Sequence, residues 1–67
     1  MKEFIEWLWK NNYYFTVYKD TITVITNQKT LTFEFMKNDV FIKEITNDTG
    51  KIFSIKNNLN ALKEVLM

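Results

Sequence analysis

The N-terminal residues carry apolar side chains with the period of an α-helix. Four of them recur at spacings of three and four and form one stripe on a helical wheel, opposite the charged side chains: Met1, Phe4, Ile5 and Leu8. We therefore predict a helix over residues 2–11. Trp7 and Trp9 fall on either side of the stripe, where an indole ring can pack one edge on a core and keep its N–H near water. This position allows either a structural role beside the core or a role in binding a partner.

From Tyr13 to Ile55 the pattern changes to a period of two, with β-branched and aromatic residues separated by short polar breaks. The breaks predict five strands joined by turns, which we place at Lys19-Asp20, Asn27-Gln28, Asn38-Asp39 and Asn47–Gly50. The chain has one glycine and no proline, so Asn and Asp must form most of the turns. We expect Gly50 to adopt a left-handed conformation in the last turn.

These turns also predict which residues face each other. The first sets Val17 opposite Ile22, and the second sets Ile22 opposite Phe33. The third sets Glu34 opposite Lys43, a favourable cross-strand charge pair. A shift of one residue would turn every side chain to the other face, so agreement between successive hairpins supports the assignment.

The last hairpin completes the predicted inner face of the sheet. Its turn sets Ile42 opposite Ile55, Ile45 opposite Ile52 and Phe53 opposite Glu44. An inward Glu44 indicates either a bulge in this strand or a position at the margin of the core. The predicted inner face consists of Phe15, Val17, Ile22, Val24, Leu31, Phe33, Phe35, Ile42, Phe53 and Ile55.

After Ile55, the Asn57-Asn58 pair can cap a second helix. Its apolar stripe consists of Leu59, Leu62, Val65 and Leu66. The predicted fold class is α+β, a five-stranded antiparallel meander sheet with an N-terminal and a C-terminal helix packed on one face, in the order αβββββα. We expect residues 1–67 to form one domain.

Composition excludes several sources of stability and affinity. Without cysteine there is no disulfide and no thiolate metal site, so packing alone holds a small domain together and self-association gains weight. The formal net charge is +1 and every basic residue is lysine, which is unlike a protein that binds many phosphates.

Charged residues interrupt the apolar N-terminal segment, so we expect no signal peptide or membrane span, and a cytoplasmic location.

The residues available for catalysis are few. The chain has no histidine and no cysteine, and Ser54, the only serine, has no histidine to activate it. Carboxylate chemistry would depend on Glu34, Glu44, Asp39 or Asp48, which we interpret as turn and ion-pair residues. One glycine cannot form a phosphate-binding loop. We therefore predict a protein that is not an enzyme and that has no cofactor and no metal.

The outer face of the predicted sheet is the candidate site, because it is less polar than a solvent-facing sheet surface needs to be. We predict that the residues that contact a partner are Tyr14, Tyr18, Ile25, Met36, Phe41, Lys43, Ile45 and Ile52, with Trp7 and Trp9 on the first helix. The alternative is that these residues are merely good strand formers.

Three kinds of partner suit this face. Another protein is favoured, because aromatic residues and methionine are enriched at interface cores. A second copy of the chain is compatible with this. Single-stranded nucleic acid, stacked on the tyrosines, is the alternative. In size and general character only, with no shared motif, the chain resembles the accessory proteins, anti-CRISPR proteins among them, with which phages block host enzymes or defence systems. This resemblance suggests a phage or mobile-element inhibitor.

Overall fold

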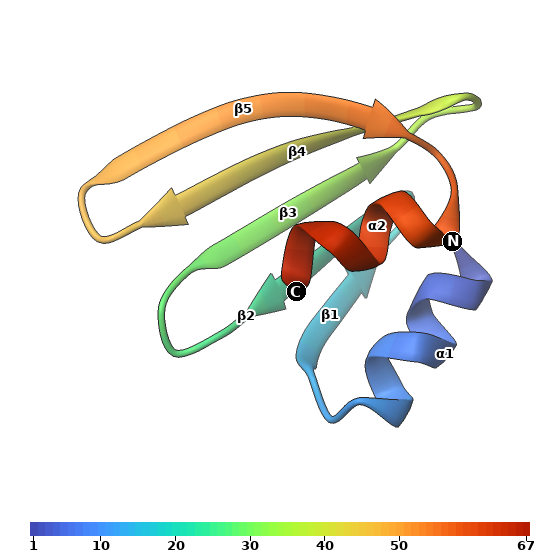
Figure 1. Cartoon of the computed structure of the whole chain (residues 1–67), viewed down its shortest axis with the longest axis horizontal. Helices are drawn as coiled ribbons and strands as arrows, with labels where there is room; N and C mark the ends of the chain where they lie inside the picture. Colours follow the sequence, from blue (N-terminus) through green and yellow to red (C-terminus); the bar gives the residue numbers. More distant parts are fainter.

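The computed structural model describes residues 1–67 as a helix, five strands and a second helix in chain order (Figure 1). The elements are α1 (Lys2–Lys10), β1 (Tyr14–Tyr18), β2 (Thr21–Ile25), β3 (Thr30–Phe35), β4 (Asp39–Thr46), β5 (Thr49–Lys56) and α2 (Leu59–Leu66). The strands form one antiparallel sheet in the order β1-β2-β3-β4-β5, so each strand pairs with its neighbours in the sequence. The predicted order αβββββα is confirmed.

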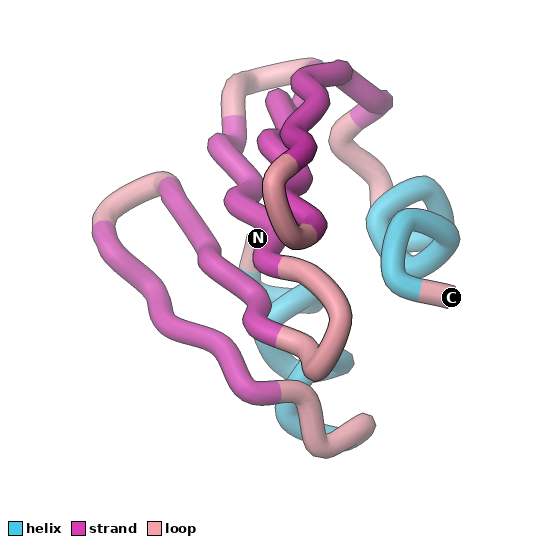
Figure 2. The backbone as a smooth tube through the Cα atoms, turned by 90° about the vertical axis from the view of Figure 1, so that its left-hand side faces the viewer, coloured by secondary structure: helices cyan, strands magenta, loops and turns pink.

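Both helices pack on the inner face of the sheet, where their apolar stripes close the core. α2 passes in front of the strands in Figure 1, and Figure 2 shows it on one side of a strongly twisted sheet. Phe4 and Leu8 of α1 and Leu62 of α2 are buried. The ring of Phe4 lies 5.0 Å from that of Phe33 in β3, a distance typical of tilted aromatic pairs. Neither helix combines the length and the apolar character that crossing a bilayer would require.

The start of α2 follows the predicted cap. Asn58 is in an extended conformation, and its side-chain Oδ1 accepts a hydrogen bond of 2.9 Å from the N–H of Ala61. This bond satisfies one of the amide groups that the first helical turn leaves without a partner. α1 ends at Lys10, and the left-handed residue Asn12, with φ of 61°, turns the chain into β1.

The first two hairpins have the predicted registers. Val17 faces Ile22 across the Lys19-Asp20 turn, and Ile22 faces Phe33 across the Asn27-Gln28 turn. The second turn is held by Thr26, whose hydroxyl oxygen accepts hydrogen bonds from the N–H groups of Gln28 and Lys29.

The last two hairpins are displaced by two residues from the predicted registers. The turn after β3 is centred on Lys37-Asn38, so Phe33 faces Ile42 and Phe35 faces Val40, whereas Glu34 does not face Lys43. A shift of two residues leaves every side chain on its predicted face. The observed register pairs large apolar residues inside, which outweighs one exposed charge pair worth a few tenths to about 1 kcal/mol.

The β4–β5 hairpin shows the same displacement. Its turn consists of Asn47-Asp48, so Ile55 faces Val40 rather than Ile42, and Phe53 faces Ile42 rather than Glu44. On the other face, Ile52 lies opposite Lys43, and Ile45 opposite Gly50.

Gly50 is not the left-handed residue of this turn. No glycine has a positive φ, and Asn47 takes the left-handed conformation with φ of 53°. Asparagine tolerates this conformation better than most residues because its short polar side chain can bond locally. Gly50 instead lies in β5, where an added Cβ would meet the carbonyl oxygen of Glu44 at 3.6 Å, an ordinary contact.

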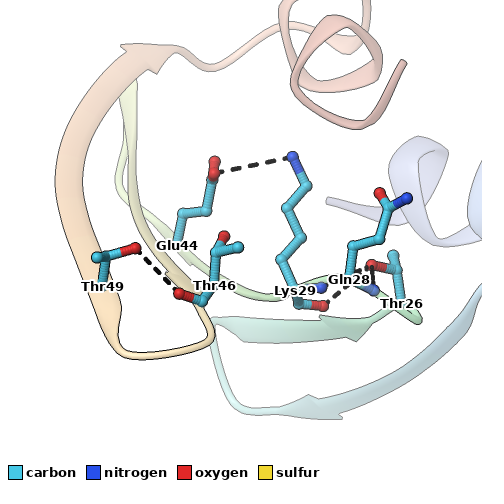
Figure 3. A network of polar contacts seen from close by, with 6 residues as sticks. All are labelled: Thr26, Gln28, Lys29, Glu44, Thr46 and Thr49. Atoms are coloured by element: carbon cyan, nitrogen blue, oxygen red, sulfur yellow. Dashed lines mark hydrogen bonds and ion pairs between the residues drawn. The ribbon is translucent and has the colours of Figure 1, made fainter.

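Glu44 lies at the margin of the core and not in its centre. Its carboxylate is 3.8 Å from the ammonium nitrogen of Lys29, and the two side chains point toward each other in Figure 3. Thr46 and Thr49 continue this polar end of the inner face toward the hairpin tip, where the hydroxyl of Thr49 donates to the carbonyl oxygen of Thr46. The strand therefore needs no bulge to accommodate an inward glutamate.

The predicted inner face needs one correction, and one of its residues is less covered than the rest. The prediction omits Val40, which is fully buried between Phe35 and Ile55. Val17 points to the inner face but is 44% exposed, because β1 has a neighbouring strand on one side only. The other predicted inner residues are buried, except for Phe15, Phe53 and Ile55, which are half-buried and packed against the core.

Candidate protein-binding surface

The outer face of the sheet carries no helix, and its side chains form three rows that cross all five strands. From β1 to β5, these are the Tyr14 row (Tyr14, Ile25, Thr30, Ile45, Gly50), the threonine row (Thr16, Thr23, Thr32, Lys43, Ile52) and the Phe41 row (Tyr18, Thr21, Glu34, Phe41, Ser54). With strands about 4.8 Å apart, each row is about 19 Å long. The predicted outer-face residues of the strands therefore share one surface.

The Tyr14 row is the most apolar of the three. Tyr14 is 68% exposed, and Ile25 beside it and Ile45 further along are 43% and 42% exposed. Thr30 lies between the two isoleucines and is partly covered. The three large apolar side chains of this row are all exposed.

The threonine row occupies the middle of the face. Three threonines stand side by side on β1, β2 and β3, and Lys43 and Ile52 continue the row on β4 and β5. Ile52 is 76% exposed, more than any other large apolar residue of the five strands. Its diagonal neighbours on β4 are Phe41 and Ile45, at a separation that large side chains can bridge.

The Phe41 row carries two more of the predicted partner-binding residues, Phe41 and Tyr18, on the same face. Phe41 is 46% exposed, and a shallow depression beside it is lined by Thr32, Glu34, Ile42, Lys43 and Ile52. Met36, 42% exposed, lies just beyond the end of β3 in the turn that leads to β4. Tyr18 is at the far end of the row, with the ammonium of Lys19 5.4 Å from its ring centre.

Together these residues form an apolar arc around a centre of threonines. It runs from β1 along the Tyr14 row and turns at β5 toward Phe41. We call the set of Tyr14, Ile25, Phe41, Ile45 and Ile52 the outer-face patch. Several large apolar side chains exposed on one face of a small protein are typical of an interaction site.

The two tryptophans have different positions. Trp9 is 76% exposed and shares a depression with Tyr14, together with Asn12 and Tyr13, so it extends the surface around the β1 edge. Trp7 is half-buried against the core: its ring is 5.4 Å from that of Tyr13, and the ammonium of Lys63 lies 5.7 Å from its centre. The structure does not bring Trp7 to the outer face.

The lysines are dispersed rather than gathered on this face. Lys29 pairs with Glu44, Lys51 lies 5.5 Å from the ring of Phe53, and Lys63 covers Trp7. In the three rows, Lys43 is the only cation and Glu34 the only anion. The outer face therefore has no cluster of cations of the kind that binds a chain of phosphates.

The acids considered for catalysis are separated. Glu44 belongs to the ion pair at the inner margin, Glu34 to the outer face, and Asp48 to the β4–β5 turn, while Asp39 begins β4. No three acids come together as a metal-binding group. Comparisons with models of protein families, with curated proteins and with solved structures found no match.

Proposed function

We propose that this protein is a non-catalytic binding module that docks on another protein through the outer-face patch. The observation that carries the proposal is the open face of the sheet, where Tyr14, Phe41 and Ile52 stay 46–76% exposed although the opposite face is covered by two helices. An antiparallel sheet that merely faces water is served by polar side chains on that side. Large apolar residues there are costly to solubility unless a partner covers them.

The arrangement of the patch suits a protein partner. Tyrosine and phenylalanine are enriched in the buried cores of interfaces, and residues of the rim are polar. Here the threonines and the Lys43 and Glu34 side chains offer hydrogen-bonding groups between and beside the apolar residues. The sheet holds all of them on one platform, so little conformational entropy is lost when a partner binds.

The class of partner that we favour is a cytoplasmic host enzyme or defence protein. An inhibitor of this kind needs no chemistry of its own, and it acts by occupying a surface. A chain of 67 residues with a single open face is sufficient for that task. The protein would then belong functionally with the small inhibitors encoded by phages and mobile elements.

The proposal is tested by affinity capture from candidate host extracts. Three immobilised proteins are compared: the wild type, a double variant Tyr14→Ala with Ile45→Asp, and a control Glu64→Ala on the exposed side of α2. We expect one protein retained in stoichiometric amount by the wild type and the control and lost with the double variant. Equal retention by all three would refute a role for the outer-face patch.

Single-stranded nucleic acid is the second candidate ligand. Tyr14 and Tyr18 are 68% and 72% exposed on the same face of β1, and Lys19 stands beside the second ring, so bases could stack there next to a cation. A salt titration with labelled oligonucleotides distinguishes the two proposals. Phosphate-driven affinity must fall steeply with salt, and absence of binding at low salt removes this candidate.

A further inference from the structure

The β1 strand is an edge of the sheet, and it lacks the residues that usually protect an edge strand from pairing. Its only neighbouring strand is β2, and its sequence, Tyr14–Tyr18, contains no charge, no glycine and no proline. Natural edge strands carry such residues because unpaired backbone groups otherwise attract another strand. Four of its five residues are exposed, including Val17 on the inner face.

The opposite edge is different. β5 contains Gly50 and two lysines, and Lys51 points to the inner face, where its ammonium lies beside the ring of Phe53. An inward charge near an edge discourages pairing, because a second strand would have to bury it. The chain thus protects one edge and leaves the other free.

The hydrogen-bonding groups at the free edge can be assigned from the register. The Tyr18–Thr21 pair closes a two-residue turn, so these residues bond to each other, and bonded pairs then alternate along the ladder. Thr16 directs its backbone groups toward β2, whereas the N–H and C=O groups of Phe15 and Val17 point away from the sheet. Neither of these N–H groups forms any of the backbone bonds made outside helices and strands.

We propose that the occupant of this edge is a second copy of the chain, with the two β1 strands antiparallel and related by a twofold axis at Thr16. This register is self-complementary. Phe15 of each copy faces Val17 of the other, and these are the residues whose backbone groups point outward, so both copies exchange hydrogen bonds. On the outer face Tyr14 lies opposite Tyr18 of the second copy. Aromatic and β-branched residues are the favoured cross-strand partners.

The pairing has a structural consequence for both faces. Two five-stranded sheets become one sheet of ten strands, with all four helices on one side. Val17, 44% exposed in the single chain, becomes covered beside Phe15 of the second copy. The two outer faces lie side by side, and their threonine rows join at Thr16. The dimer rests on the free edge alone and does not depend on the proposed protein partner.

Charge substitutions at Thr16 test the position of the axis. Thr16 is exposed on the outer face, so a charged side chain there is compatible with the single-chain fold. In the dimer the two copies of this side chain stand directly opposite each other, where like charges repel. The experiment measures solution mass by light scattering for the wild type, Thr16→Lys, Thr16→Glu and an equimolar mixture of the two variants, with circular dichroism to verify folding.

We expect a mass of twice 8.1 kDa for the wild type at micromolar concentration, the single-chain mass for each variant alone, and the double mass again for the mixture. The control Ile52→Lys, in the same row but on the β5 edge, should keep the double mass. A single-chain mass for the wild type at micromolar concentration, or a double mass for Thr16→Lys alone, would overturn the proposal. Ile45→Asp on β4 does not touch β1, so loss of partner binding in that variant with an intact dimer separates the two proposals.

Discussion

The ammonium nitrogen of Lys29 lies 3.8 Å from a carboxylate oxygen of Glu44, and this ion pair closes the polar end of an otherwise apolar inner face. Both side chains are mostly covered, at 28% and 17% exposure, yet each still reaches water. Lys29 stands at the end of the β2–β3 turn, so the pair ties that turn to β4. A strand with an inward glutamate is thereby accommodated without a break in the ladder.

The coupling between these two charges should be small and dependent on salt. A double-mutant cycle with Lys29→Met and Glu44→Gln is expected to give about 0.2–1 kcal/mol, because partly exposed pairs gain little in solvent of high dielectric constant. Urea unfolding measures it, and 1 M salt should reduce it by screening. A coupling above about 2 kcal/mol would show that the pair is buried more deeply than the structure indicates.

Phe33→Ala should be the most damaging of the core substitutions. Phe33 is fully buried at the centre of the sheet, against the ring of Phe4, and loss of such a side chain costs about 3–5 kcal/mol. That is comparable with the whole stability of a small domain. Thermal melts of Phe33→Leu provide a milder variant in case the alanine variant does not fold. Thr23→Ala, on the outer face, should change stability little, and the reverse order would mean that the two faces have been exchanged.

From the sequence alone, Gly50 would be the residue of the β4–β5 hairpin that is most sensitive to substitution. The structure predicts that Asn47 is more sensitive than Gly50. Gly50 has no positive φ and room for a methyl group, so Gly50→Ala should be neutral or stabilise by about 0.4–1 kcal/mol. Asn47 has a φ of 53°, so Asn47→Ala should lower the free energy of unfolding of the protein by about 1 kcal/mol. Chemical unfolding of the two single variants decides the matter. Greater destabilisation by Gly50→Ala would place the left-handed residue at the glycine after all.

Removal of the α2 cap should loosen the C-terminal helix. Asn58→Ala loses the bond to the N–H of Ala61, at a cost of about 1 kcal/mol, whereas Asn58→Ser should retain most of the stability. Asn60→Ala is the control, because it is exposed within the helix, where alanine is favoured. Equal effects of the alanine substitutions at 58 and 60 would be inconsistent with a capping role.

Side-chain alternation predicted the faces of this sheet more reliably than turns predicted its registers. Period-two patterning assigns each residue to a face without any knowledge of its partner, so Phe33 and Tyr14 lie where the pattern placed them. Registers depend on where each turn is centred. At the third turn the sequence offered a charge pair, Glu34 with Lys43, and the fold instead adopted the register that buries Val40 against Phe35.

In the candidate site, too, some features could be predicted from the sequence and others could not. The exposed positions of Tyr14, Ile45 and Ile52 follow from alternation together with the placement of the helices on the other face. The position of Trp7 does not, because a residue beside a helical stripe can lie against the core or away from it, and contacts with Tyr13 and Lys63 decide this only in the folded chain. The free β1 edge likewise becomes evident only once the strand order is known.

The most direct test of the proposed function is the dissociation constant of the captured partner, measured by calorimetry for the wild type and for Ile45→Asp. Ile45 stands in the Tyr14 row with its side chain 42% exposed, so an aspartate there should fold normally but place a charge in the interface. We expect the affinity to fall by at least about tenfold, the equivalent of about 1.4 kcal/mol, while Glu64→Ala leaves it unchanged. An Ile45→Asp variant that binds as tightly as the wild type would contradict docking through the outer face.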